Sequence, residues 1–448
     1  MAARGLKLLE RHRLNKDYAL ALITGYGLMG LTIVVQLALI PLYLTHLGKE
    51  RFGVLAMIMA ANNYVAIGIG WLSGSMARVM AERAATGDRD GFAEAYAFSK
   101  LVYVAYALIA LAVFWMIAPW LLTDVLADWE IRAAILLSCV LLLVSYEYNA
   151  DRLAFIARHR QARGNANEAV GQLFFAAGVG IGLMMDAGLP GVVGAQIVSM
   201  LCVRLLAWMH WRHDDFCLSW KLRITGFKAL WQRVSGRVGR DYVVYGILLL
   251  TLQADALIVG WLAGPEVAAN FYLLWRIPEV CILLLSRIPG AYAPHIIAMD
   301  ARCDHGAIRN GYRKGMTALL VFAGFAALVY GFAGHWILSL WVADNAPEGY
   351  WHYAIAAMAM FFIAVSRWPA EFAYALVNTK PLVKIVTLEV TLKLILVWLL
   401  FGALGYMAPL VAISLVHALG IFYLYIWLGK NNFSFKAQQK IEYTKGVA

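Results

Sequence analysis

The sequence predicts an all-α membrane protein with about twelve transmembrane helices in two parallel six-helix halves, and three observations lead to this prediction. The 448 residues are 62% hydrophobic and 15% charged, and their mean hydropathy is +0.69. Apolar runs of 18 or more residues recur along the chain, and each can cross a hydrocarbon core of about 30 Å. Short patterns of small residues recur at a nearly constant offset. A soluble protein is excluded by this composition.

The hydropathy pattern divides the chain into twelve spans. We expect them at 18–46, 53–77, 101–126, 133–150, 169–186, 189–211, 242–263, 268–298, 316–342, 350–377, 385–404 and 407–428. The first 17 residues are polar and basic, and the apolar run after them is too long for the core of a signal peptide. We therefore expect an uncleaved N-terminus.

The distribution of basic residues predicts that both termini are cytoplasmic. Basic residues crowd the N-terminal tail, the even-numbered loops and the C-terminal tail, including Arg78, Arg83, Arg89 and Lys100 after the second span. The odd-numbered loops hold only Lys49, Arg51 and Arg132. We expect a cytoplasmic tail at 1–17, a six-helix lobe at 18–211, a basic linker at 212–241, a second lobe at 242–428 and a cytoplasmic tail at 429–448.

An internal repeat links the two halves. Gly48-Lys-Glu matches Gly264-Pro-Glu at an offset of 216, and Gly188-Leu-Pro-Gly matches Gly405-Tyr-Met-Ala at an offset of 217. Between them, Trp71-Leu-Ser-Gly-Ser-Met-Ala aligns with Arg287-Ile-Pro-Gly-Ala-Tyr-Ala at 216. Each half holds an even number of spans, so the halves are parallel repeats about an axis along the membrane normal.

Nothing in the sequence indicates catalysis. The loops have no room for a soluble catalytic domain, and no Walker motif, nucleophile elbow or metal-ligand spacing is present. The protein is therefore expected to be no enzyme and to use no cofactor or metal. Its basic residues fall in short loops, so they indicate topology and not nucleic-acid binding. We expect free thiols at all five cysteines, which are Cys139, Cys202, Cys217, Cys281 and Cys303.

Several segments resemble a known family. The stretches IPLYLTHLGKERFGVLAM, DALIVGWLAGPEVAANFYLL and AYALVNTKPLVK, with the glycine-containing turns before the sixth and last spans, look like the polysaccharide flippases. These belong to the MOP (MATE-like) superfamily, which also contains multidrug antiporters and lipid II flippases. The first span has no charged residue between Asp17 and Lys49, which differs from the arginine-containing first span of the lipid II flippases.

The resemblance implies a multi-pass protein of the bacterial inner membrane. Such a protein moves undecaprenyl-diphosphate-linked oligosaccharide units from the cytoplasmic to the periplasmic leaflet by alternating access, for surface polysaccharides such as the O-antigen of lipopolysaccharide. It also implies the bilayer, a polysaccharide polymerase and a chain-length regulator as partners.

Ten charged residues lie within the expected spans, and eight of them are in the second half. They are Glu147, Arg204, Asp255, Arg276, Glu279, Arg287, Arg367, Glu371, Glu389 and Lys393. Each costs at least about 2.5 kcal/mol at membrane depth unless it is paired or faces water. Helical spacing predicts three self-neutralising pairs, which are Arg276 with Glu279, Arg367 with Glu371, and Glu389 with Lys393. Arg204 and Glu147 lie near the cytoplasmic ends of their spans and are expected to reach toward water.

The hairpin from 252 to 298 is the strongest candidate for a polar cavity lining. Arg276 and Arg287 are three helical turns apart, about 16 Å along one face, and each precedes an Ile-Pro pair that should bend the helix. Arginine binds phosphate oxygens through a planar fork of donors. We therefore expect Arg287, Arg276, Arg367 and Lys393 to contact the diphosphate, and Asp255, Glu279, Glu371 and Glu389 to be coupling or cavity charges. For Asp255, a salt bridge to Arg276 across the hairpin is the alternative.

Other interpretations remain open at this point. Trp71, Trp275, Trp368, Tyr272 and Tyr374 could stack on sugars, but packing is the ordinary role of such residues. A cation-coupled multidrug antiporter of the same fold is the alternative function. It would need an anionic cavity, whereas the first span holds no acid and the hairpin holds two arginines. A membrane-embedded glycosyltransferase or polymerase would need larger loops.

Overall fold

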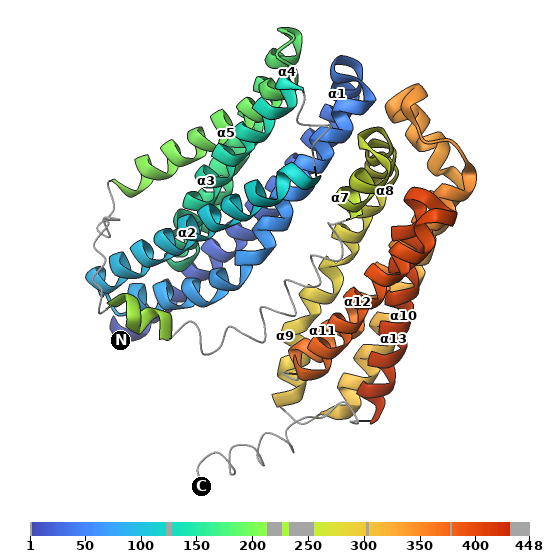
Figure 1. Ribbon diagram of the computed structural model, residues 1–448. Helices are drawn as coiled ribbons and strands as arrows, with labels where there is room; N and C mark the ends of the chain where they lie inside the picture. The colour runs from blue at the N-terminus through green and yellow to red at the C-terminus, as the bar shows by residue number, and fades with distance from the viewer. Residues whose placement is uncertain are drawn as a thin grey trace. The chain divides into compact units, whose positions relative to one another are not determined.

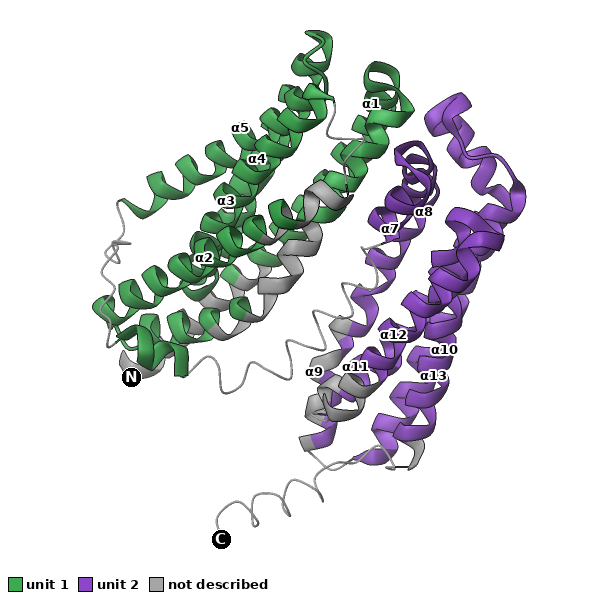
Figure 2. Ribbon diagram, viewed as in Figure 1, with its two compact units in different colours: residues 1–242 green, residues 243–448 purple. Residues whose placement is uncertain are grey.

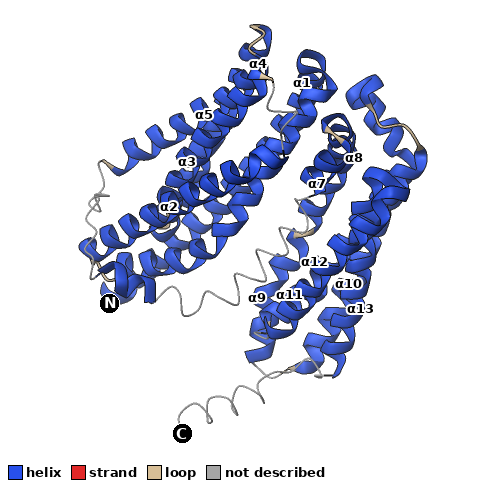
Figure 3. Ribbon diagram, viewed as in Figure 1, coloured by secondary structure: helices blue, strands red, loops and turns tan. Residues whose placement is uncertain are grey.

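The computed structural model describes residues 2–121, 128–212, 226–232, 255–301, 304–376 and 379–430, and every regular element among them is a helix (Figure 3). Eight helical segments in this part of the chain are long and apolar enough to cross a membrane, judged by length and composition. The chain is therefore a multi-pass membrane protein. Two of these segments, Leu20–Asn62 and Ile385–Leu428, each extend over two of the expected spans, so the count of twelve stays a prediction.

The chain packs as two units, residues 1–242 and residues 243–448 (Figure 2). In unit 1, the described helices are α1 (Ala2–Ala85), α2 (Arg89–Leu121), α3 (Trp129–Ala157), α4 (Gln161–Met184) and α5 (Gly188–Trp211), labelled in Figure 1. The first helix packs against α2, α3 and α4, and α5 packs against α3 and α4. Helix α1 thus contains the first two expected spans and begins at Ala2, inside the expected polar tail.

The turn between α1 and α2 corrects the expected loop after the second span. Asp88 closes this turn by accepting a hydrogen bond from the Gly91 backbone N–H at 2.9 Å and by pairing with Arg83. Only residues 86–88 separate the two helices, so Lys100 lies inside α2 and is buried. The error arose because a charged residue before an apolar run was assigned to the loop, although the helix had already begun.

Small residues bring α4 and α5 into close contact. A Cβ added at Gly178 would lie 3.0 Å from the Cβ of Ala195, and one added at Gly171 would lie 2.3 Å from a methyl group of Val203. The Ser199 hydroxyl donates to the Gly171 carbonyl at 2.7 Å across the same contact. Transmembrane helices pack in this way where small residues let the backbones approach.

Unit 2 is described from Asp255 onward. Its helices are α7 (Asp255–Ala263), α8 (Pro265–Leu285), α9 (Arg287–Ala301), α10 (His305–Val342), α11 (Tyr350–Ala375), α12 (Thr379–Leu404) and α13 (Ala408–Lys430), with short 3₁₀ turns η2 (Ala343–Asn345) and η3 (Gly405–Met407). Helix α11 packs against α8, α9, α10 and α13, and α12 packs against α13. The expected linker at 212–241 lies outside the described residues except for 212 and 226–232, as do the start of the seventh span and the tail from 431.

The prolines of the eighth span act differently from the expectation that both would bend one helix. Helix α8 continues through Pro278 but ends at Leu285, four residues before Pro289. Pro289 has no N–H to donate to the Leu285 carbonyl, and its ring crowds that carbonyl. Pro278 likewise leaves the Leu274 carbonyl without its helical donor, and the buried Tyr330 hydroxyl of α10 donates to this oxygen at 2.5 Å.

Backbone conformation confirms the internal repeat at its two turns. Gly48 and Gly264 have φ of 77° and 92°, and Gly188 and Gly405 have φ of 56° and 54°. These left-handed values favour glycine because it has no Cβ. The same turns therefore stand at matching places in the two units.

Candidate functional site

A fully buried ion pair in unit 2 contains two of the predicted site residues. The Lys393 ammonium of α12 lies 2.7 Å from the Asp255 carboxylate of α7, with side chains 3% and 4% exposed. The alternative pairing of Asp255 with Arg276 is therefore wrong, and the structure pairs the Lys393 ammonium with Asp255, where helical spacing predicted Glu389. Helical spacing gives the depth of a residue and its neighbours on one helix, but not which other helix its face meets.

Glu389 lies instead beside His417 of α13. The carboxylate and the His417 ring are 3.9 Å apart, and both side chains are buried. Gly420 makes room for this carboxylate, because a Cβ there would lie 2.0 Å from a Glu389 oxygen. Neither ring nitrogen of His417 has a hydrogen-bond partner among the described residues. His417 was missed because a lone histidine in an apolar run is usually a packed core residue.

Arg367 of α11 belongs to the same neighbourhood. Its guanidinium interacts electrostatically with Glu389 and His417, and also with Glu371 on its own helix. The buried-charge cluster of unit 2 therefore consists of Asp255, Arg367, Glu389, Lys393 and His417, contributed by α7, α11, α12 and α13.

The Arg276–Glu279 pair is confirmed. Its two charged groups are 2.7 Å apart, and Arg276 is only 11% exposed, whereas Glu279 is 43% exposed. The Arg276 guanidinium also lies 5.6 Å from the centre of the Tyr272 ring, within the range of a cation–π contact. Most of the charge of Arg276 is therefore balanced inside the protein.

Arg287 does not share a helix face with Arg276. Helix α8 ends at Leu285 and Arg287 is the first residue of α9, so the expected ladder of two arginines three turns apart is wrong. The cause is the interruption before Pro289 described above. The Arg287 side chain is exposed, in contrast to the buried Lys393.

Unit 1 contains a second buried network, most of which the sequence analysis missed. The Lys100 ammonium lies 2.9 Å from Glu147 and donates to the Tyr96 hydroxyl at 3.0 Å. That hydroxyl donates to Asp151 at 2.9 Å, and Arg204 lies 2.7 Å from the other Glu147 oxygen. Glu147 and Arg204 thus pair with each other, a contact that the sequence analysis did not predict, and their side chains remain 21% and 29% exposed.

The signal for this network was present in the sequence. Tyr96 and Lys100 are four residues apart on one helix, and so are Glu147 and Asp151 on another. Such spacing places each pair on one helix face. The sequence analysis placed Lys100 in a loop, where a lysine faces water and needs no buried acid as a partner. The pairing of Lys100 with Glu147 was therefore not considered.

The two networks share one position of the repeat, where Asp151 corresponds to Arg367 at an offset of 216, and otherwise occupy different positions. At an offset of 216, Lys100 and Glu147 correspond to Met316 and Ile363, and Asp255 corresponds to Leu39. Each unit therefore has apolar side chains at most positions where the other has charge. The helices of one unit thus form without most of the charges of the other.

The two best described aromatic candidates serve packing. Trp368 is buried and donates its ring N–H to the Tyr312 carbonyl at 3.0 Å, and its ring centre is 5.2 Å from that of Phe372. Trp275 is buried as well. The side chains of Trp71 and Tyr374 lie outside the described residues.

Metal and thiol chemistry can be judged only for the described residues. Among them, no group of three or more His, Cys, Asp or Glu side chains could hold a metal ion. Cys139, Cys202 and Cys281 are free thiols, as expected. Cys217 and Cys303 lie outside this part of the chain.

Known structures share this fold. An inward-facing multidrug resistance MATE family transporter of the MOP superfamily has a TM-score of 0.71 at 13% identity, with 90% of this chain and 94% of that chain covered. The lipid II flippase MurJ in an inward closed conformation has a TM-score of 0.66 at 12% identity, covering 93% and 89%. A MOP superfamily transporter from Pyrococcus furiosus, described as having a binding pocket of reverse polarity, scores 0.57 at 13%, covering 94% of each chain.

These likenesses show that the chain has the fold of the MATE-type transporters. No family model and no curated protein sequence matches the chain. The polysaccharide-flippase resemblance therefore enters the argument on function only as a proposal.

Proposed function

We propose that this protein is a flippase that moves undecaprenyl-diphosphate-linked oligosaccharide units from the cytoplasmic to the periplasmic leaflet of a bacterial inner membrane, by alternating access. The observation that carries the proposal is the distribution of charge. The spans expected from hydropathy in unit 2 hold four basic residues, whereas the segment from 18 to 48 in α1 holds no charged residue. The four are Arg276, Arg287, Arg367 and Lys393.

Their environments divide these cations into two kinds. Lys393 and Arg276 each pair with an acid at 2.7 Å and are nearly enclosed by protein. We therefore assign them a role in the electrostatic potential of the site and not a direct contact with the ligand. Arg287 is exposed at the start of α9, and Arg367 is half-buried. A guanidinium matches the geometry of phosphate oxygens. We therefore assign the diphosphate contact first to Arg287 and second to Arg367.

A cation-coupled multidrug antiporter is the second candidate, favoured by the acids Asp255 and Glu389 buried in unit 2. A cavity for cationic drugs needs acids that remain available to the ligand. Asp255 is instead held by Lys393 at 2.7 Å, so this acid is neutralised within the protein. The charge distribution therefore supports the flippase more strongly.

Deletion of the gene in its source bacterium tests the proposal. A flippase mutant should accumulate lipid-linked repeat units on the cytoplasmic side, and the cloned gene should reverse this accumulation. Susceptibility to cationic drugs should not change. Normal surface polysaccharide together with raised drug sensitivity would instead establish the antiporter. The same strain would show whether polymerase and chain-length regulator act downstream, because their product should disappear.

A further inference from the structure

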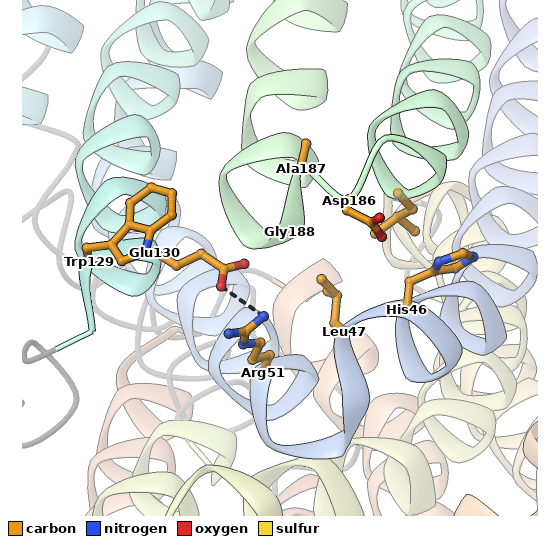
Figure 4. A pocket seen from close by; sticks show the side chains of 9 residues that line it. His46, Leu47, Arg51, Trp129, Glu130, Asp186, Ala187 and Gly188 are labelled. Atoms are coloured by element: carbon orange, nitrogen blue, oxygen red, sulfur yellow. Dashed lines mark ion pairs between the residues drawn. The ribbon is translucent and has the colours of Figure 1, made fainter.

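A small pocket opens in unit 1 and is lined by none of the residues of the buried network around Glu147. It is enclosed by the turn in α1 around Gly48, the start of α3, and the turn between α4 and α5. Figure 4 shows Glu130 and Trp129 on one side and Asp186 and His46 on the other, with Arg51 between them. The cavity has a volume of about 160 Å³.

The polar groups of this pocket are held in place. One Glu130 oxygen lies 2.9 Å from the Arg51 guanidinium, and the other accepts a hydrogen bond from the Leu189 backbone N–H at 2.8 Å. Gly188 permits this approach, because a Cβ there would lie 1.8 Å from the Glu130 carboxylate. Asp186 adopts a φ of 55°, which is uncommon for a residue with a side chain. The Glu130 carboxylate is therefore held by two contacts, whereas the Asp186 side chain is exposed beside it.

The internal repeat provides a comparison within the molecule. Unit 2 repeats the turn geometry at Gly264 and Gly405, and there the Tyr406 hydroxyl contacts the His352 ring at 3.2 Å. The polar residues of the pocket correspond to apolar residues of unit 2 at offsets of 216 or 217. His46 corresponds to Leu262 or Ala263, and Arg51 to Val267 or Ala268. Glu130 corresponds to Ala346 or Pro347, and Asp186 to Gly402 or Ala403. Unit 2 thus forms the corresponding turns without a carboxylate or arginine at these four positions, so the polar set is particular to unit 1.

The volume of the pocket and the charge of its side chains indicate which class of ligand it can bind. Drug-sized ligands occupy pockets of about 300–1,000 Å³, so about 160 Å³ suits a single ring. The indole of Trp129 is 71% exposed and offers an apolar face. Carboxylates accept hydrogen bonds, and the arginine donates them. Two acids against one arginine leave a net negative charge, which opposes phosphate and uronic acids.

We infer that this pocket binds one neutral or amino sugar ring, with its C–H face on Trp129 and its hydroxyls on Glu130, Asp186 and Arg51. The inference deepens the proposed function, since the oligosaccharide is the natural source of such a ring. By the expected topology the pocket lies on the periplasmic side. There it would hold the sugar of a unit that has already crossed.

Binding by the purified full-length protein in lipid nanodiscs tests the inference without requiring transport. The probes are methyl β-glucoside, glucosamine, N-acetylglucosamine, glucuronic acid and inorganic pyrophosphate, with binding measured by saturation-transfer NMR and titration. At least one neutral or amino sugar should bind at least tenfold more tightly than glucuronic acid or pyrophosphate. Trp129→Ala and Asp186→Asn should each weaken that binding at least threefold.

Trp351→Ala is the matched control. Trp351 is exposed near the start of α11, as Trp129 is at the start of α3, and these two helices hold the fourth expected span of each half. It should bind sugar as the unchanged protein does. The inference is overturned if no sugar in the panel binds, if pyrophosphate binds best, or if Trp129→Ala binds normally. Sugar binding by a protein that does not flip lipid would leave this inference standing and remove the proposed function.

Discussion

At the scale of single residues, the buried charges show which physical effects decide partners inside a membrane protein. An isolated charge at membrane depth is costly, so each one finds a partner or a route to water. Asp255 could have met this need with Arg276, yet Arg276 is satisfied three residues away by Glu279. The Lys393 ammonium, which is more deeply buried, takes Asp255 instead.

The first prediction concerns this Lys393–Asp255 pair. Removing one partner leaves an uncompensated buried charge, which typically costs about 3 to 5 kcal/mol, whereas replacing both by apolar residues can be nearly neutral. Lys393→Met alone should therefore lower the melting temperature and the membrane level of the protein. Lys393→Met combined with Asp255→Leu should recover most of that loss. Equal damage in single and double variants would show that the pair does not act as a unit.

The second prediction concerns the charge of Arg287. If this residue binds the diphosphate, Arg287→Lys should keep partial transport, because a point cation still attracts phosphate but lacks the planar fork. Arg287→Ala should abolish transport, and Arg287→Glu should be at least as harmful because it repels the headgroup. The measurement is transport per unit of membrane-inserted protein. Arg309→Ala, which removes another exposed arginine, is the control and should transport normally. Normal transport by Arg287→Ala would end the headgroup assignment.

These residues also show how far the sequence could define the candidate site. Hydropathy and spacing identified Asp255, Lys393, Glu389 and the Arg276–Glu279 pair as important buried charges. They could not show that Asp255 meets Lys393, because that contact joins helices far apart in the chain and depends on helix rotation. His417 escaped notice because nothing in its own helix distinguishes it from a packed histidine.

At the scale of elements, prolines shape unit 2 through the carbonyls that they leave without donors. Pro289 ends α8, whereas Pro278 leaves its helix continuous and is accompanied by the hydrogen bond from Tyr330 to the Leu274 carbonyl. The sequence predicted that both prolines would disturb the helix. Which carbonyl would find a substitute donor could not be predicted, because the donor comes from another helix.

The third prediction follows from this substitute hydrogen bond. Tyr330→Phe should cost about 1 kcal/mol of stability, because the Leu274 carbonyl then loses its donor in a buried place. In a Pro278→Ala background the alanine N–H can bond to that carbonyl, so Tyr330→Phe should cost much less. A double-mutant cycle on unfolding in detergent measures the difference. Equal costs in the two backgrounds would contradict the proposed compensation.

At the scale of the whole molecule, the repeat explains how one fold can hold two different sets of charge. Matching turns at Gly48 and Gly264, and at Gly188 and Gly405, were predictable because glycine at a left-handed turn leaves a clear signature in the sequence. The boundaries between loop and helix were less predictable. Helices such as α10, which begins at His305 and not at 316, extend past the apolar run, so hydropathy marks the membrane and not the helix end.

The fourth prediction concerns topology, on which the sidedness of the sugar pocket depends. The basic bias of the even-numbered loops predicts that Ala187 faces the periplasm and Gly226 the cytoplasm. Ala187 lies in the turn between α4 and α5, and Gly226 begins the short described helix of the expected linker, with α5 between them. A single crossing must therefore place the two sites on opposite sides. Alkaline phosphatase should be active when it is fused after Ala187 and inactive when it is fused after Gly226. A reporter that is active only in the cytoplasm should show the reverse. Activity of the same reporter at both sites would mean that α5 does not span the bilayer. A consistent reversal at both sites would place the sugar pocket on the cytoplasmic side, where it would meet the unit before transport.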